Sequence, residues 1–241
     1  MFFHILVPLA DQFGALNVFR YLTFRTGGAV ITALIISFLF GPVLIEMLKS
    51  RQKGGQPIRQ DGPETHLLTK QGTPTMGGVL ILLALGLATL LWADLSNGFI
   101  WATLGVTLAF GFIGFLDDFM KVSKRDTRGL PGKLKLLMQV VIAAVATFWI
   151  MRHLPAGMVT TLTIPFLKNV VVDLGWMFVI FAVLVMVGSS NAVNLTDGLD
   201  GLAIVPVMIA AGVFAVIAYL SGHSVFAGYL QIHHIKGAGE L

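Results

Sequence analysis

Ser189–Gly201 reads SSNAVNLTDGLDG and lies between two apolar segments that are each long enough to cross a bilayer. The stretch brings together two carboxylates, two amides and two glycines. An ionised side chain in the hydrocarbon core of a bilayer costs several kcal/mol. We therefore expect this stretch at a membrane surface, facing water, a metal ion or a ligand, and it is a first candidate site.

The composition of the whole chain is that of an integral membrane protein. Of its 241 residues, 56% are hydrophobic and 12% are charged, whereas soluble domains average about 25% charged residues. No large aqueous domain fits into the remainder. The chain contains no cysteine, which excludes disulfides and thiol chemistry within it.

Six stretches, including the two that flank Ser189–Gly201, are long, apolar and without charge, and each is predicted to be a transmembrane helix. At about 1.5 Å per residue, ~16 to 21 residues span roughly the thickness of the hydrocarbon core. Backbone groups in lipid must bond within their own segment, which favours helices. The predicted fold is an all-α polytopic membrane protein, a single integral membrane domain over residues 1–241. The six stretches are Thr26–Ile45, Met76–Ala93, Phe99–Leu116, Leu136–Met151, Leu174–Ser190 and Leu202–Gly222.

Positive charges are distributed unequally between the connections. Eleven of the sixteen Lys and Arg residues follow the first or the third apolar segment. The positive-inside rule makes these connections cytoplasmic and places the N-terminus outside. Ser189–Gly201 then falls on the cytoplasmic side as well. The eleven residues are Lys49, Arg51, Lys53, Arg59, Lys70, Lys121, Lys124, Arg125, Arg128, Lys133 and Lys135.

The external connection after the fourth segment has a β-prone pattern. Met158–Pro165 is rich in threonine and apolar residues, and Val170–Val172 follows it. This pattern predicts a short β-hairpin at the membrane surface, with an irregular loop as the alternative.

Asp117 and Asp118 form a second candidate site, at the cytoplasmic end of the third segment. Paired carboxylates suit a hard cation such as Mg²⁺. Adjacent helical residues point about 100° apart, so we expect the two to have different roles, and Lys121 to neutralise one of them. The alternative is an ordinary solvated helix end, although acids there oppose the helix dipole.

The amides and acids of Asn191–Gly201 have helical spacing. Asn191, Asn194 and Asp197 share a face if the preceding helix continues that far, and the glycines permit close approach of a ligand to the backbone. The pattern suits the wall of a pocket for a base, a ribose or a phosphate. The alternative is a capped turn.

Two basic stretches complete the candidates. Lys70–Gly78 leads into the second segment and places a lysine, hydroxyls and backbone N–H groups where an anion can bind; the alternative is a capped helix entry. Lys121–Lys135 supplies phosphate ligands or, alternatively, contacts with anionic lipid.

Together, Lys70–Gly78, Phe115–Phe119 and Asn191–Gly201 resemble, in order and in topology, the polyprenyl-phosphate sugar-1-phosphate transferases. The form GTPTMGG, preceded by DGPETH at Asp61–His66, is similar to the phospho-N-acetylmuramoyl-pentapeptide transferases (translocase I) of that family. The resemblance runs from about Arg20 to the last residue.

The resemblance implies a reaction. Phospho-N-acetylmuramoyl-pentapeptide moves from UDP-N-acetylmuramoyl-pentapeptide to undecaprenyl phosphate with Mg²⁺, which yields UMP and lipid I for peptidoglycan synthesis. It implies an active site on the cytoplasmic face of a bacterial inner membrane, with membrane lipid and no nucleic acid as partner. Whether the protein is a homodimer stays open, as does the choice between direct displacement and a covalent phospho-aspartyl route.

The resemblance also implies roles for single residues. Asp117 and Asp118 stand at the motif positions of the family's catalytic acids and metal ligands. Lys121 and Lys133 are expected to contact phosphates. The residues expected to line the nucleotide pocket are Lys70, Thr75, Asn194, Asp197, Gly198, Leu199 and Asp200.

The chain departs from the family in length, because members usually have about ten helices. We therefore expect an N-terminal fragment that is inactive by itself. Three alternatives stay open: a related transferase that uses UDP-N-acetylglucosamine, a membrane transporter, and a non-catalytic scaffold. Transport sites usually lie near the bilayer midplane, whereas the charges here lie at the ends of the segments.

Overall fold

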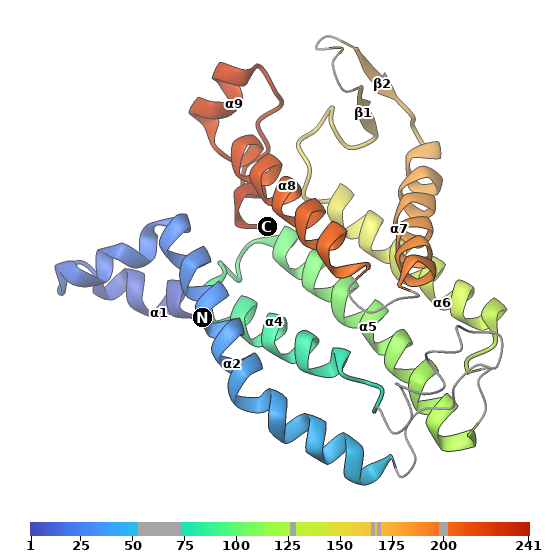
Figure 1. Ribbon diagram of the computed structural model, residues 1–241. Coiled ribbons are helices and arrows are strands. Elements are labelled where there is room, and N and C mark those ends of the chain that lie inside the picture. Colours follow the sequence, from blue (N-terminus) through green and yellow to red (C-terminus); the bar gives the residue numbers. More distant parts are fainter. Residues whose placement is uncertain (53–73, 126–128, 165–166, 168–169, 198–201) are drawn as a thin grey trace. The chain divides into compact units, whose positions relative to one another are not determined.

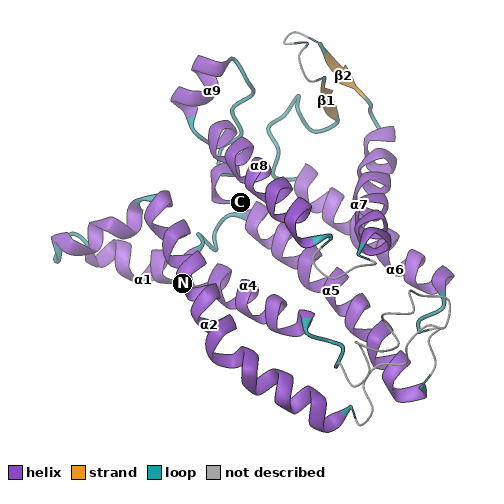
Figure 2. Cartoon of the chain, in the orientation of Figure 1, coloured by secondary structure: helices purple, strands orange, loops and turns teal. Residues whose placement is uncertain are grey.

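A computed structural model of the chain describes residues 1–52, 74–125, 129–164, 167, 170–197 and 202–241 (Figure 1). Helices make up most of it, with one small pair of strands (Figure 2). The predicted class, an all-α polytopic membrane protein, is confirmed. The helices are α1 (Phe2–Leu9), α2 (Leu22–Arg51), α4 (Gly78–Trp92), α5 (Gly98–Lys124), α6 (Gly132–Met151), α7 (Met177–Thr196), α8 (Ile204–Gly222) and α9 (Ser224–Leu230), with 3₁₀ turns η1 (Gly14–Arg20) and η2 (Ala238–Glu240).

An apolar helix occupies each of the six segments predicted to cross the membrane. Five of them, α2, α5, α6, α7 and α8, have 19 to 30 residues and are long and apolar enough to span a bilayer. The helix α4 has 15 residues, which corresponds to about 22 Å. It is shorter than the predicted segment because Met76 has a φ of 71° and Ala93 is extended.

Glycines bring α2 and α4 into close contact. A Cβ atom on Gly28 of α2 would collide with the ring of Trp92, at the end of α4, and one on Gly41 would lie 3.6 Å from Leu80. The Trp92 indole also donates a hydrogen bond to the hydroxyl of Thr32, at 2.9 Å. Small residues at helix contacts and polar bonds between helices are how membrane helices associate.

The chain divides into two compact units. The first comprises residues 1–93 and 107–139, and the second comprises residues 94–106 and 140–241. Thr75, Asp117, Asp118, Lys121 and Lys133 belong to the first unit. Asn194 and Asp197 belong to the second. The expectation of a single membrane domain stays a prediction.

The second unit contains the predicted hairpin. Strands β1 (Thr161–Thr163) and β2 (Val171–Asp173) pair antiparallel, with Thr161 opposite Asp173. The Thr160 hydroxyl donates to Asp173 Oδ1 at 2.6 Å, and the Gly175 N–H donates to the same oxygen at 2.9 Å. Both hydrogen bonds hold the pKa of the Asp173 carboxyl below its usual value, and the one from the Thr160 hydroxyl has the larger effect.

The sequence analysis did not predict α1. This helix has eight residues, includes Pro8 and is too short to give a clear periodicity. Aromatic contacts join it to the rest of the first unit, because the Phe2 ring lies 5.1 Å from that of Trp92 and 6.3 Å from that of Phe19. The segment is therefore packed against η1 and the end of α4.

Candidate active site

The helix α5 continues for about two turns beyond Leu116, where the apolar segment ends. These turns carry Asp117, Asp118 and Lys121. The acids are therefore held in regular helix, before its end at Lys124, and not at a frayed terminus. Their helical spacing brings the lysine at i+4 and i+3 within reach of both.

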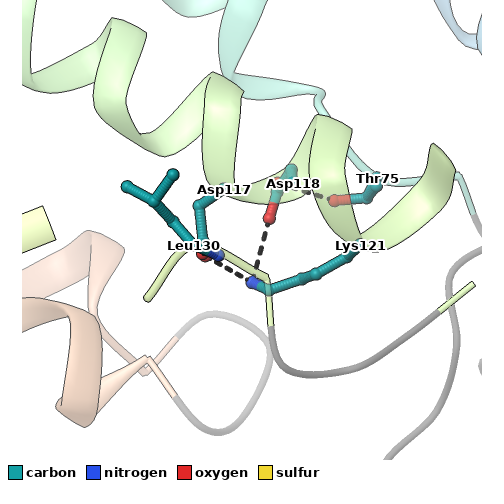
Figure 3. Close-up of polar contacts among 5 residues, drawn as sticks. All are labelled: Thr75, Asp117, Asp118, Lys121 and Leu130. Atoms are coloured by element: carbon teal, nitrogen blue, oxygen red, sulfur yellow. Dashed lines mark hydrogen bonds and ion pairs between the residues drawn. The ribbon is translucent and has the colours of Figure 1, made fainter. Parts of the chain in front are cut away.

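Asp117 is held at both of its oxygens (Figure 3). Its Oδ2 lies 2.6 Å from the Lys121 Nζ, and its Oδ1 accepts a hydrogen bond of 2.7 Å from the N–H of Leu130. The side chain is 16% exposed. The same carboxylate therefore binds the lysine and fixes the start of the segment that leads into α6.

Gly129 makes this arrangement sterically feasible. It has a φ of 60°, a left-handed conformation that favours glycine. A Cβ atom there would collide with Asp117 Oδ1 and lie 2.8 Å from the Lys121 Cε. A larger residue at position 129 would therefore disturb both the carboxylate and the lysine.

Asp118 is more open than Asp117, with 34% of its side chain exposed. Its Oδ1 lies 3.3 Å from Lys121 Nζ, and its Oδ2 accepts a hydrogen bond of 2.8 Å from the Thr75 hydroxyl. Lys121 thus contacts both carboxylates, whereas the sequence had led us to expect that it neutralises one of them. Its long stem places the ammonium between neighbours that point in different directions.

Thr75 reaches Asp118 from the segment before α4. The side chain of Gln52, at the end of α2, donates to the Thr75 carbonyl at 3.1 Å and accepts from the Thr75 N–H at 2.9 Å. Met76 then has a φ of 71°, a conformation that costs about 1–2 kcal/mol in a non-glycine residue. The sequence analysis missed Gln52, and no motif or periodicity marks it.

The two acids suit a magnesium ion, although they cannot by themselves complete its coordination. Mg²⁺ prefers oxygen ligands and keeps several waters. Each carboxylate oxygen has two lone pairs, so one remains after the contacts just described. Among the described residues, no three His, Asp or Glu side chains come together. Asp117 and Asp118 would hold the ion, in competition with the Lys121 ammonium.

Lys133 lies in the first turn of α6, in the same unit as the acids. Its side chain is exposed and forms no ion pair with a described residue. A cation at the start of a helix opposes the helix dipole, so the position gains nothing locally from its charge. The residues Lys70, Gly198, Leu199 and Asp200 lie outside the described part of the chain.

In the second unit, α7 continues through Thr196, and the Asp197 N–H bonds to the Val193 carbonyl at 3.1 Å. Neighbours in the series Asn191, Asn194 and Asp197 therefore lie on the same side of the helix, as expected from the i, i+3 spacing. Asn191 donates to the Val187 carbonyl of its own helix at 2.8 Å. The side chains of Asn194 and Asp197 are exposed.

Known protein families match both the acidic cluster of α5 and the polar residues at the end of α7. The family model for glycosyl transferase family 4 covers residues 100–235, which include both acids and Asn191–Asp197. The chain belongs to this family. The phospho-N-acetylmuramoyl-pentapeptide-transferase signature 1 covers residues 70–82, which include Thr75. The phospho-N-acetylmuramoyl-pentapeptide-transferase of Granulibacter bethesdensis is 61% identical over 241 residues, which is all of this chain and 67% of the relative.

The matches confirm the resemblance seen in the sequence and identify the chain as a transferase sequence, and five of its helices are long and apolar enough to span a membrane. Within glycosyl transferase family 4, the signature and the relative place it with the phospho-N-acetylmuramoyl-pentapeptide-transferases. The chain spans about two thirds of that relative's length.

Proposed function

We propose that the protein transfers phospho-N-acetylmuramoyl-pentapeptide from its UDP carrier to undecaprenyl phosphate, which gives lipid I and UMP. The observation that carries this proposal is the cluster of Asp117, Asp118 and Lys121, in the last two turns of the apolar helix α5, with Thr75. A soluble nucleotide donor and a lipid acceptor can meet only at such a membrane surface. The Granulibacter relative is named for transfer of the same phospho-N-acetylmuramoyl-pentapeptide group.

The reaction joins two anions, and the cluster has the charges to assist it. An oxygen of the lipid phosphate forms a new P–O bond to the sugar-bearing phosphorus, and the P–O bond to UMP breaks. Lys121 places a positive charge beside the acids, and Mg²⁺, when bound, neutralises phosphate charge and orients the leaving group. Direct attack and a route through a phospho-aspartyl intermediate balance equally well.

The remaining candidates have supporting roles in this proposal. Lys133 contacts phosphate. A cytoplasmic location of the site follows from the positive charges that flank α2 and α5. Nucleotide binding is assigned residue by residue from the resemblance of the motifs. These nucleotide residues are Lys70, Thr75, Asn194, Asp197, Gly198, Leu199 and Asp200.

The test is UMP release by the complete protein that the gene encodes, purified in detergent with undecaprenyl phosphate. We expect release with UDP-N-acetylmuramoyl-pentapeptide and Mg²⁺, loss of release on chelation with EDTA, and recovery when Mg²⁺ is restored. Preferred release from UDP-N-acetylglucosamine would support the related transferase instead. No release from either donor, by a protein that is folded, would contradict the proposal.

A further inference from the structure

We infer that Gln52 is a positioning residue of this site: it holds Thr75 and, through the Thr75 hydroxyl, orients the Asp118 carboxylate. The inference rests on the proposed function, because it assigns Gln52 a part in the same transfer. It starts from a residue that belongs to none of the sequence motifs.

Gln52 is placed for this role by the end of α2. The helix ends at Arg51, and the Gln52 N–H bonds to the Leu48 carbonyl at 2.9 Å. Its side chain is therefore carried by a long membrane helix, and the residue is buried, with 7% of its surface exposed. A buried polar side chain needs hydrogen-bond partners. The Thr75 backbone offers the Gln52 amide one acceptor and one donor.

The contact between Gln52 and Thr75 has two points. The amide nitrogen donates to the Thr75 carbonyl at 3.1 Å, and the amide oxygen accepts from the Thr75 N–H at 2.9 Å. The donor and the acceptor of one amide lie in one plane. The pair therefore fixes both the place and the direction of the Thr75 backbone.

The backbone of Thr75 in turn determines where its hydroxyl points. Threonine is branched at Cβ, which restricts χ1, and the hydroxyl donates to Asp118 Oδ2 at 2.8 Å. The other oxygen of Asp118 lies 3.3 Å from Lys121. Asp118 is thus held from two sides, once from its own helix and once through Thr75.

The turn after Thr75 needs such a contact. Met76 has a φ of 71°, in the left-handed region that non-glycine residues rarely adopt. A backbone conformation of this kind persists only where surrounding contacts impose it. Gln52 supplies two of these contacts, so its loss would let the segment relax and the Thr75 hydroxyl turn away.

The test measures kcat and KM of the complete protein for Gln52→Leu, in the wild type and in a Thr75→Val background. In the wild type we expect kcat to fall about 10- to 100-fold, the size of effect that misplaced catalytic groups produce, with smaller changes in KM. In the Thr75→Val background, where the hydroxyl is already absent, we expect less than about a 2-fold further loss.

A second variant, Gln52→Glu, keeps the shape of the side chain and tests the hydrogen bond that the amide nitrogen donates to Thr75. The ionised carboxylate cannot donate to the Thr75 carbonyl, whereas the protonated form can. Its kcat relative to wild type should therefore rise as the pH falls, which a general loss of stability would not produce. Among the residues that the structure describes, the Thr75 hydroxyl contacts Asp118, and Lys121 contacts Asp118 in turn. Both variants are compared with wild type at each pH.

The matched control is Ser50→Ala. Ser50 is exposed on the last turn of α2, and its hydroxyl donates to the Met47 carbonyl of its own helix, at 2.8 Å. We expect wild-type kcat for this variant, and melting temperatures in detergent establish that all variants are folded.

Unchanged kcat in Gln52→Leu, or an equal loss in both backgrounds, would overturn the inference. If Gln52→Leu does not fold, a constant ratio of Gln52→Glu to wild-type activity across pH would overturn it as well. The proposed function fails separately: in that case the folded wild-type protein releases no UMP from either donor, whatever Gln52 does.

Discussion

The acidic cluster of the first unit and the polar face of α7 in the second unit have the same kinds of side chain but different surroundings. Asp117 and Asp118 are held by Lys121, by the Leu130 N–H and by Thr75. On α7, Asn194 and Asp197 are exposed. Preorganised charges act on the transition state, whereas exposed groups are suited to recognising a ligand. The difference suggests chemistry at the first region and nucleotide binding at the second.

The largest expected effect is that of Asp118→Asn, which removes the charge but keeps the shape. We expect kcat to fall about 10²- to 10³-fold, as for the loss of one preorganised electrostatic contact, with little change in KM for the nucleotide donor. Steady-state kinetics of UMP release by the complete protein measures both.

Asp173→Asn, in the hairpin, is the matched control, because this carboxylate also accepts two hydrogen bonds but belongs to the unit without the acidic cluster. Its kcat should equal that of wild type. Equal losses in the two variants would mean that the cluster has no special role and would end the comparison.

The next prediction concerns Gly129→Ala. The new Cβ would collide with Asp117 and crowd Lys121, and the φ of 60° is unfavourable for alanine. We expect about a 10-fold loss of kcat and a free energy of unfolding lower by about 1–2 kcal/mol. Kinetics and thermal unfolding in detergent measure the two effects.

Gly132→Ala serves as the control for this glycine. It lies three residues further on, and a Cβ atom there would meet nothing within 4 Å. If Gly129→Ala kept full activity, the fastening of Asp117 to the segment before α6 would be irrelevant to the chemistry.

The second region should respond in KM and not in kcat. Asn194→Ala removes an exposed amide, and the loss of one uncharged hydrogen bond corresponds to about a 3- to 10-fold weaker affinity. We expect this increase in KM for the UDP donor with an unchanged kcat. Thr196→Ala is the control, because its hydroxyl bonds to the Ala192 carbonyl of its own helix, at 2.8 Å. A fall in kcat without a change in KM would contradict the division of roles.

Much of the fold could be predicted from the sequence, because a bilayer demands long uncharged helices. The failure at α4 is instructive: composition alone does not show that Met76 takes a left-handed conformation, so the predicted segment was too long at its start. The helix α1 was missed because eight residues give too little periodicity.

For the candidate site, the sequence could supply the residue types but not their contacts. Asp117, Asp118 and Thr75 belong to motifs with a recognisable chemistry. Gln52 is an ordinary polar residue after an apolar helix, and Gly129 is one of 27 glycines. Gln52 contacts Thr75, which lies 23 residues further along the chain, and Gly129 lies against Asp117 of the preceding helix. Only the folded chain brings these segments together.

The smallest expected effect is that of Thr160→Val in the hairpin, which tests whether hydrogen bonds to a carboxylate matter where no chemistry is proposed. Thr160 and the Gly175 N–H lower the pKa of Asp173. A lowered pKa in the folded state stabilises the fold above the pKa of the unfolded chain, and this contribution is lost as the pH falls through the folded value. Thr160→Val should therefore raise the pKa of Asp173 towards its usual value, as NMR titration would measure, and should leave UMP release unchanged. A loss of activity would mean that the hairpin contributes to the transfer, and the contrast between the held acids of the first unit and the rest of the chain would no longer mark the site.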